Sequence, residues 1–336
     1  MLGGDLLKKV NFAIIGCGTI SSTHIAALKE IPKARLVAVY DRSLEKVQAI
    51  AQIEHVKGYT DMEALLADDE VDAVIILTAS GMHADMGIKA AQAKKHVIVE
   101  KPIDIDVDKA KHLIEQCGQN NVKLSCIFQH RYDQDTITLK EAIEDNKLGV
   151  IHSGCCHTKW FRSQAYYDET LWRGTKELDG GGALMNQSIH QLDLFQYLMG
   201  DVEEVFGYTA TRAHTGIDVE DIAMATLKFK NGAIGILEAN VCAYPGFNTR
   251  IDLCGSKGTV ILEDNKVTHW ALKSGETYQS RKTDFPHKEQ LEEITNAILE
   301  NRDPLVTGDE ALKSLILVEA IYQSSILGRP IKVDYR

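Results

Sequence analysis

The sequence predicts two domains of different class. Residues 1–128 are expected to form a doubly wound α/β domain with a parallel sheet, and residues 129–336 an α+β domain with a large, mostly antiparallel open sheet. Short apolar runs alternate with amphipathic stretches up to residue 128, whereas beyond about residue 149 strand-like segments follow one another with few helices. The chain of 336 residues is also long enough for two domains.

The predicted strands of the first domain are rich in Val and Ile and lack polar alternation, which is typical of strands covered by helices on both faces. Thr60 followed by Glu63 predicts a capping box at the start of the third helix. The predicted strands are 10–15, 36–40, 73–77, 96–99 and 122–128, and the predicted helices are 20–30, 43–52, 61–67, 83–94 and 106–120.

The second domain is expected to be built from hairpins and to end in helices. Asn231-Gly232 lies between two strand-like runs and predicts a tight turn with positive φ at both positions. The predicted strands are 150–160, 202–213, 221–230, 233–241, 248–254 and 258–263, and the predicted helices of the tail are 288–300 and 309–327.

Composition narrows the class of protein. A net charge of −11 argues against a nucleic-acid binder, although a local site for an anionic metabolite stays possible. The apolar run after Lys8 and Lys9 is too short for a signal peptide, and no segment reaches the roughly 18 apolar residues of a membrane span. Seven cysteines without a C-x-x-C pair predict reduced thiols, and the histidines show no metal spacing. We therefore expect a cytoplasmic protein with no metal site and no membrane partner.

The loop after the first predicted strand carries a dinucleotide fingerprint. Gly16 and Gly18 stand at the first two glycine positions, and Ser21 replaces the third glycine. Asp41 ends the second strand, where a carboxylate grips a ribose hydroxyl and favours NAD. Arg42 and the serine after it could instead hold the 2′-phosphate of NADP, so NADP stays open. The first domain is thus expected to be a Rossmann domain that binds NAD(P).

Two further segments carry candidate chemistry. Glu100-Lys101-Pro102 follows the strand 96–99, at the sheet edge where ligands bind in such folds. In the second domain, glycines 180–182 lead into a helix with Asn186 and His190 four residues apart, hence on one face.

The chain resembles the glucose-fructose oxidoreductase / inositol dehydrogenase / rhizopine-catabolism family over nearly its whole length. Three segments carry the resemblance and occur in the same order as in that family: the glycine loop, the E-K-P segment and the glycine-led helix with its histidine. The resemblance implies hydride transfer between a sugar-like alcohol and NAD(P), with Lys101 and His190 facing the substrate hydroxyl. An aspartate is usual where Asn186 stands here. We assign His190 as proton acceptor, because a histidine pKa of about 6.5 suits that role. Lys101 would polarise the reacting oxygen and Asn186 would position it.

Segments 129–131, 166–168, 172–175 and 183–187 resemble dehydrogenases that oxidise C3 of UDP-N-acetylglucosaminuronate. Arginine forks suit such an anionic substrate, and Arg131, Arg162 and Arg173 are expected near it. The predicted substrate residues are Arg131, Tyr166, Tyr167, Trp172, Arg173 and Gln187, and the predicted cofactor residues are Gly16, Gly18, Thr19, Ile20, Asp41, Arg42, Thr78, His83, Glu100, Lys101 and Gln129.

Two other functions stay open at this point. One is a dehydrogenase of a free sugar or cyclitol such as an inositol, and the other is a non-catalytic NAD-binding regulator, against which the presence of Lys101 and His190 argues. The resemblance also implies a homo-oligomer, a dimer or a tetramer, formed through the open face of the second domain's sheet.

Overall fold

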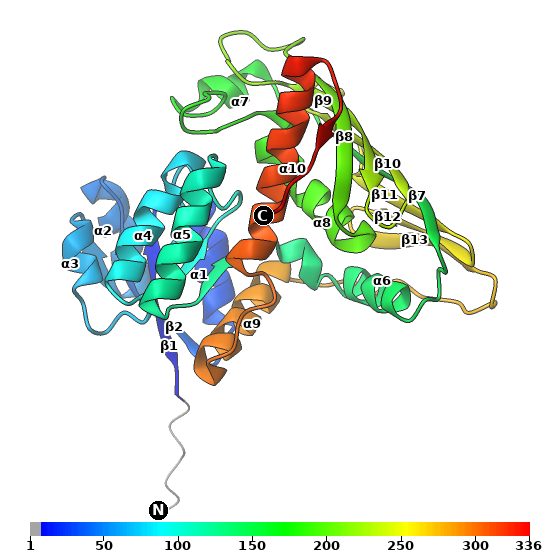
Figure 1. Ribbon diagram of the computed structural model, residues 1–336. Coiled ribbons are helices and arrows are strands. Elements are labelled where there is room, and N and C mark those ends of the chain that lie inside the picture. Colours follow the sequence, from blue (N-terminus) through cyan, green and yellow to red (C-terminus); the bar gives the residue numbers. More distant parts are fainter. Residues whose placement is uncertain (1–7) are drawn as a thin grey trace, which may run out of the picture. The chain divides into compact units, whose positions relative to one another are not determined.

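The computed structural model describes residues 8–336 and contains two compact units, coloured along the chain in Figure 1. The first unit comprises Met1–Gln129 together with Phe285–Ala311, and the second comprises His130–Asp284 together with Leu312–Arg336. Residues 1–7 of the predicted first domain lie outside the described residues. Within residues 8–336, no helix has both the length and the apolar character needed to cross a membrane.

The sheet of the first unit has six parallel strands in the order β3-β2-β1-β4-β5-β6. The chain starts in the middle and winds outward in both directions, which confirms the doubly wound prediction. In folds of this kind ligands bind where the strand order reverses, here at the carboxyl ends of β1 and β4. The short edge strand β3 was not predicted, because its three residues contain no apolar run. The strands are β1 (Val10–Ile15), β2 (Ala34–Tyr40), β3 (Lys57–Tyr59), β4 (Ala73–Ile76), β5 (His96–Val99) and β6 (Leu124–Cys126).

The helices of the first unit begin close to their predicted positions. The third helix, however, is capped by Asp61, whose side chain accepts from the N–H of Glu63, so the capping box predicted at Thr60 is wrong by one residue. These helices are α1 (Ser21–Lys29), α2 (Leu44–Glu54), α3 (Met62–Leu66), η1 (Ser80–Met82), α4 (His83–Gln92), α5 (Val107–Asn120) and α9 (Pro286–Glu300), and η2 (Gln129–Tyr132) follows β6.

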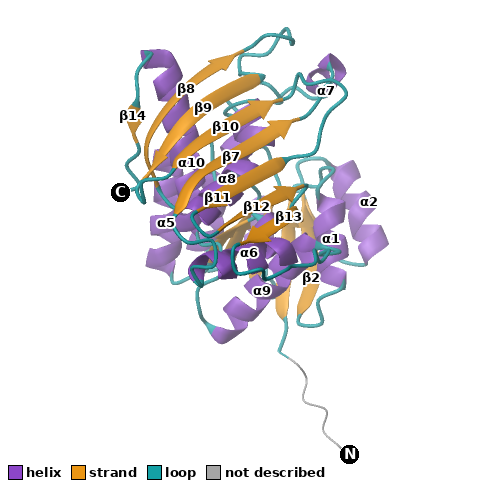
Figure 2. Ribbon diagram, turned by 90° about the vertical axis from the view of Figure 1, so that its right-hand side faces the viewer, coloured by secondary structure: helices purple, strands orange, loops and turns teal. Residues whose placement is uncertain are grey.

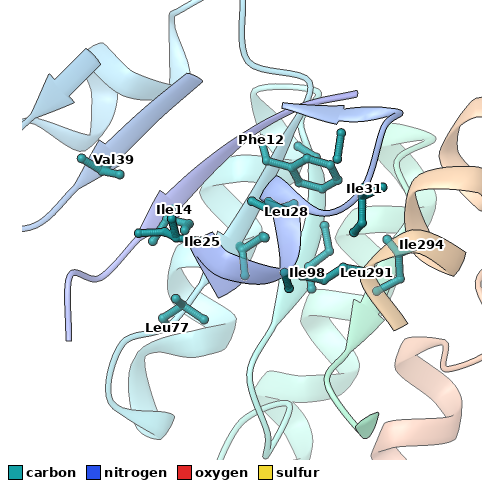
Figure 3. Close-up of a cluster of buried hydrophobic side chains, with 14 of the residues drawn as sticks. Phe12, Ile14, Ile25, Leu28, Ile31, Val39, Leu77, Ile98, Leu291 and Ile294 are labelled. Carbon is teal, nitrogen blue, oxygen red and sulfur yellow. The ribbon is translucent and has the colours of Figure 1, made fainter. Parts of the chain in front are cut away.

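Helix α9 belongs to the first unit although it lies far along the chain. Its buried Leu291 and Ile294 join the apolar cluster around β1 and α1, near Phe12, Leu28 and Ile31 (Figure 3). The sequence analysis placed this stretch in the second domain. The helical period shows which face of α9 is apolar, but it does not show which sheet that face covers.

The sheet of the second unit has eight strands in the order β13-β12-β11-β7-β10-β9-β8-β14, and only β7 and β10 pair in parallel. The prediction of a large, mostly antiparallel sheet is therefore confirmed, with β13 and β14 as unpredicted edges. The strands are β7 (Ile151–Lys159), β8 (Val202–Ala210), β9 (Ile222–Phe229), β10 (Ile234–Asn240), β11 (Arg250–Gly255), β12 (Gly258–Glu263), β13 (Lys266–Leu272) and β14 (Ile331–Lys332).

Helices α8 and α10 cover one face of this sheet, and Figure 2 shows the strands of the opposite face toward the viewer. Side chains alternate between the two faces along β9 and β10, with one set buried and the other exposed. The helical elements of this unit are α6 (Gln134–Glu144), α7 (Gln164–Asp168), η3, a short π-helix (Ala183–Gln187), α8 (Ile189–Met199) and α10 (Gly308–Leu327).

The hairpin between β9 and β10 differs from its prediction. Gly232 has φ of +89°, but Asn231 does not have positive φ. The N–H of Phe229 donates to the carbonyl of Ala233, so the loop has three residues and closes with a left-handed glycine. The predicted two-residue turn is therefore wrong, because the strands pair one residue further from the turn.

Candidate active site

The loop between β1 and α1 makes a tight turn that depends on its glycines and on Ser21. Gly16 has φ of +106°, and a Cβ there would lie 2.9 Å from the backbone of Leu77. Gly18 has open space where a Cβ would point. The hydroxyl of Ser21 donates to the carbonyl oxygen of Gly18 at 2.6 Å, and this serine is buried. Serine therefore serves at the third glycine position, because it fits and also closes the turn.

Backbone amides at this loop are arranged to receive an anion. The N–H groups of Gly18, Thr19 and Ile20 donate to no acceptor within residues 8–336, and they lie at the N-terminus of α1. Free amides and the positive end of a helix dipole together favour a phosphate group. The loop therefore fits the pyrophosphate of a dinucleotide.

The carboxylate of Asp41 is held at the end of β2. It accepts from the N–H of Cys17 and from the N–H of Ser43, each at 2.9 Å. Arg42, the next residue, is exposed. A carboxylate fixed here can accept from ribose hydroxyls and would repel a 2′-phosphate, so these residues fit NAD.

His83 joins the loops that follow β4 and β5. Its ring is only 1% exposed, with Nδ1 2.8 Å from the carbonyl oxygen of Pro102 and Nε2 3.1 Å from that of Thr78. Thr78 is half-buried beside it, and Gln129, the first residue of η2, is buried. His83 therefore sets the spacing of two loops at the carboxyl edge of the sheet.

The carboxylate of Glu100 binds a neighbour through each oxygen. Oε1 lies 2.7 Å from Nε2 of His24 on α1, and Oε2 accepts from the N–H of Lys101 at 3.1 Å. Burial alone would raise the pKa of Glu100, but the hydrogen bond to His24 and the positive charges of His24, Lys101 and His287 lower it to about 2. The ionised carboxylate ties the backbone of Lys101 to α1.

In the second unit, the glycine run 180–182 passes close to the start of β9. A Cβ on Gly182 would lie 1.8 Å from the carbonyl oxygen of Glu220. The carboxylate of Glu220 accepts from the N–H of Gly182 at 3.0 Å and of Leu184 at 2.7 Å, and Tyr322 donates to it at 3.1 Å. Burial raises the pKa of Glu220, and these hydrogen bonds oppose the rise. The run thus anchors η3 to β9.

Asn186 lies in η3 and His190 follows one turn later in α8, both half-buried. The ring of His190 meets that of His130 edge-to-face, with centroids 5.5 Å apart. His130 is oriented by Asp133, whose Oδ2 lies 2.9 Å from Nδ1. Lys101 belongs to the first unit and Asn186 and His190 to the second.

Two guanidinium groups contact the ring of Tyr166. Arg162 lies 5.3 Å from its centroid and Arg173 lies 4.3 Å from it. Arg162 also lies 5.2 Å from the ring of the tryptophan two residues earlier, and Arg173 lies 5.7 Å from that of Trp172. Arg173 forms an ion pair with Glu169 and donates to the carbonyl of Tyr166. This arginine–aromatic cluster can bind an anionic or aromatic group.

Arg131 and Tyr167 are more deeply buried than the residues of that cluster, although the ring of Tyr167 meets that of Tyr166 edge-to-face with centroids 5.2 Å apart. Arg131 is 4% exposed and binds Asp193 through Nε at 2.9 Å and Nη2 at 2.8 Å. Tyr167 is buried with its ring 4.7 Å from that of His214, and burial raises its pKa. Both residues therefore support the interior of the second unit.

Sequence reasoning did not single out three buried groups that contact candidate residues within the two units. Asp179 accepts a hydrogen bond from Nδ2 of Asn186, Glu220 holds the glycine run, and His24 binds Glu100. The position of Asp179 directly before the glycines was a usable signal. His24 and Glu220 gave none, because each meets its partner across a long stretch of chain.

Comparison with known proteins identifies the family. Residues 10–128 match the Gfo/Idh/MocA model described as "Oxidoreductase family, NAD-binding Rossmann fold", and residues 140–333 match its "C-terminal alpha/beta domain". The chain is 29% identical to myo-inositol 2-dehydrogenase of Thermotoga maritima, covering 97% of this chain and 99% of that protein.

Two solved structures are also similar. The WlbA dehydrogenase of Bordetella pertussis, in complex with NADH and UDP-GlcNAcA, is 33% identical with a TM-score of 0.90, over 97% of this chain and 99% of that chain. The WlbA dehydrogenase of Chromobacterium violaceum, in complex with the same two molecules, is 31% identical with a TM-score of 0.91, over 97% and 96%.

Proposed function

The chain belongs to this oxidoreductase family, and on that premise we propose that it oxidises a secondary hydroxyl of a nucleotide-linked sugar acid of the UDP-N-acetylglucosaminuronate type. It is an NAD-dependent dehydrogenase by family, and its first unit carries the NAD-binding fold. The observation that supports an anionic substrate is the arginine–aromatic cluster around Tyr166. The similarity to two dehydrogenases whose structures contain UDP-GlcNAcA points the same way.

In this proposal the cofactor is held by the amides of the β1–α1 loop and by Asp41, and the loops around Thr78 and Gln129 complete its site. When bound, NAD supplies the hydride acceptor. The carboxylate of Glu100 accepts a hydrogen bond from the N–H of Lys101. This bond holds the backbone from which the lysine side chain extends. These groups lie at the carboxyl ends of parallel strands, where dinucleotides usually bind in such folds.

The proposed chemistry divides among three side chains. Lys101 polarises the reacting oxygen with its positive charge, His190 accepts the hydroxyl proton, and Asn186 orients the hydroxyl. His190 suits this role because its ring is half-buried and packed edge-to-face against a second oriented histidine. A proton accepted on imidazole can pass to solvent without a large pKa mismatch.

The anionic part of the substrate is assigned to Arg162 and Arg173. Guanidinium groups pair with carboxylate or phosphate in a bidentate geometry, and the aromatic rings around them limit their motion. Trp172 and Tyr166 add flat surfaces for a sugar or a base. Gln187 lies beside this cluster, where its Nε2 donates to the hydroxyl of Tyr166 at 3.0 Å.

The test is a single-turnover assay of purified protein with NAD⁺ and either UDP-N-acetylglucosaminuronate or myo-inositol. NADH should form with the UDP-uronate and not with the cyclitol. Lys101→Ala should lower the rate by about 100-fold or more, the usual cost of removing one group that stabilises charge on a reacting oxygen. Lys109→Ala is the matched control, an exposed lysine of the same unit that pairs with Asp85.

NADH formation with myo-inositol alone would replace the proposal by its alternative, a cyclitol dehydrogenase. The similarity to myo-inositol 2-dehydrogenase favours that alternative. A rate unchanged in Lys101→Ala on the true substrate would refute the assignment of this lysine.

We further propose that the protein forms a homo-oligomer through the uncovered face of the second unit's sheet. That face exposes Tyr208 and Met224, paired across β8 and β9, and Ile234 and Ile236 on β10. Monomeric proteins rarely leave so many large apolar side chains together on one face. A second copy of the same sheet would cover them.

A further inference from the structure

Asp179 is a buried carboxylate beside the helix that carries the proposed catalytic side chains. It is 2% exposed, and both of its oxygens accept hydrogen bonds within the second unit. Oδ2 accepts from the N–H of Gly174 at 2.9 Å, and Oδ1 accepts from Nδ2 of Asn186. The carboxylate therefore constrains how the Asn186 amide is turned.

A line of hydrogen bonds continues from Asn186 toward the arginine–aromatic cluster. Oδ1 of Asn186 accepts from Nε2 of Gln187 at 3.1 Å, and the same Nε2 donates to the hydroxyl of Tyr166 at 3.0 Å. Oε1 of Gln187 accepts from Nε of Arg162 at 3.0 Å. The polar chain thus runs Asp179, Asn186, Gln187, Arg162.

The two ends of this polar chain determine its direction. An ionised carboxylate only accepts hydrogen bonds and a guanidinium only donates them. The NH₂ group of Asn186 must therefore face Asp179, and the NH₂ group of Gln187 must face Asn186. Reversing either amide would place two donors or two acceptors against each other. The loss of stability would be about that of leaving one buried polar group without a hydrogen bond.

We propose that Asp179 is a positioning residue of the active site, whose acceptor-only carboxylate sets the amide orientations of Asn186 and Gln187 and thereby holds Arg162 in place for the substrate's anionic group. The inference rests on the proposed function for its last step, the contact with substrate. The same contacts account for Asn at position 186, since a carboxylate there would stand against that of Asp179.

Single substitutions should break the polar chain in a defined way. In Asp179→Asn, the new amide must turn its oxygen to the N–H of Gly174, so its NH₂ group faces Asn186. The amides of Asn186 and Gln187 must then reverse in turn, which ends with two donors facing each other at Arg162. In Asn186→Asp, two carboxyl groups face each other and one must hold a proton.

The exchange of both residues should restore the polar chain. In the double variant Asp179→Asn/Asn186→Asp, the amide at 179 offers its oxygen to Gly174 and its NH₂ group to the carboxylate at 186. That carboxylate still accepts from Gln187, so every donor keeps an acceptor. The two side chains are nearly equal in volume before and after the exchange, so packing alone predicts no rescue.

The experiment measures urea unfolding of the wild type, the two single variants and the double variant between about pH 4 and pH 7, with no substrate present. A carboxyl whose folded pKa is raised contributes stability below its unfolded pKa, near 4, and loses it as pH rises through the raised value. The free energy of unfolding of Asn186→Asp should therefore fall relative to that of the wild type as pH rises. That of the double variant should not. Tyr167 and Tyr322 interact electrostatically with Asp179, and Glu220 interacts with both tyrosines, but all three residues are common to the four proteins.

A second measurement follows kcat and KM with UDP-N-acetylglucosaminuronate. Asp179→Asn should lower kcat/KM by about tenfold or more, mostly through KM because Arg162 is displaced, and the double variant should recover most of that loss. Asp145→Asn, which changes an exposed carboxylate of the same unit at the end of α6, is the control and should match the wild type.

The inference is overturned if Asn186→Asp follows the wild type at every pH, or if the double variant is as pH-sensitive as that single variant. The unfolding result does not depend on the substrate. If the wild type fails to turn over the UDP-uronate while the pH pattern holds, the proposed substrate is wrong and the role of Asp179 in orienting Asn186 stands.

Discussion

Glu100 shows how a buried charge can hold the backbone of the next residue in place. Its carboxylate is enclosed, yet its pKa lies near 2 because His24, Lys101 and His287 supply positive charge around it. The carboxylate binds the ring of α1's histidine on one side and the N–H of Lys101 on the other. Loss of this charge should therefore disturb both α1 and the loop that carries Lys101.

We predict that Glu100→Gln lowers the free energy of unfolding at pH 7 by about 1–3 kcal/mol, the usual size of a hydrogen bond to a charged group. The folded pKa is depressed from 4.5 to about 2, so the contribution is fully present above about pH 4.5 and is lost as pH falls toward 2. Urea unfolding of both proteins at pH 7, 5, 4 and 3 measures the difference. A difference that stays constant down to pH 3 would contradict this origin.

At the residue scale, the turn and packing expected from local spacing are present, whereas the binding roles of the residues involved stay predictions. Gly16, Ser21 and Asp41 lie within one strand–turn–helix unit and the strand beside it, and their spacing predicts their contacts. Arg131 shows the limit. An arginine between two predicted segments can bind a substrate or a buried carboxylate, and the structure pairs it with Asp193, 62 residues away.

At the element scale, the glycine run before η3 is a rigid joint rather than a flexible one. Gly182 passes against the backbone of Glu220, and the carboxylate of the same residue binds the first N–H groups of η3. Helix α8, with His190, continues directly from η3. The position of the histidine is therefore coupled to β9 through this contact.

Gly182→Ala should lower the free energy of unfolding by about 1–3 kcal/mol or more, because its Cβ would meet a backbone atom that cannot turn away. Gly118→Ala is the matched control: it lies inside α5, where a Cβ would meet nothing within 4 Å, and it should stabilise by about 0.5–1 kcal/mol. Thermal unfolding compares the two. Equal effects of both substitutions would show that the contact at Glu220 carries no strain.

The apolar pattern of helix α9 predicts its buried face but not the unit on which that face packs. Its buried face is readable from the spacing of Leu291 and Ile294, and its existence was predicted close to its bounds. Its place in the first unit follows only from the apolar surface around Ile31 and Leu28, which completes the core there.

At the scale of the whole molecule, the two units have different exposed surfaces. The parallel sheet of the first is covered by helices, whereas the antiparallel sheet of the second has one face uncovered along β8, β9 and β10 (Figure 2). Large apolar side chains of these strands are exposed on that face. This face is mixed: Met224 is paired across the strands with Glu238 and Ile236 with Thr226, and large apolar side chains are nevertheless exposed beside these polar ones.

We predict that Met224→Glu combined with Ile236→Glu lowers the molar mass measured by sedimentation equilibrium toward that of one chain, because the charges would be buried at the proposed interface. Ile53→Glu is the control, since Ile53 is exposed to a similar or greater degree on α2 and should leave the mass unchanged. A wild type that sediments as a single chain would refute the proposed homo-oligomer.

The sequence by itself determined the order and class of the elements, the cofactor loop and the segments that carry Lys101 and His190, since apolar periodicity and turn residues act over a few positions. The tertiary structure decided which buried groups meet: Glu100 with His24, Gly182 with Glu220, and Asp179 with Asn186. These pairings depend on how distant or loop segments pack. Packing is set by long-range complementarity of volume and hydrogen bonding, which leaves no fixed spacing in the chain.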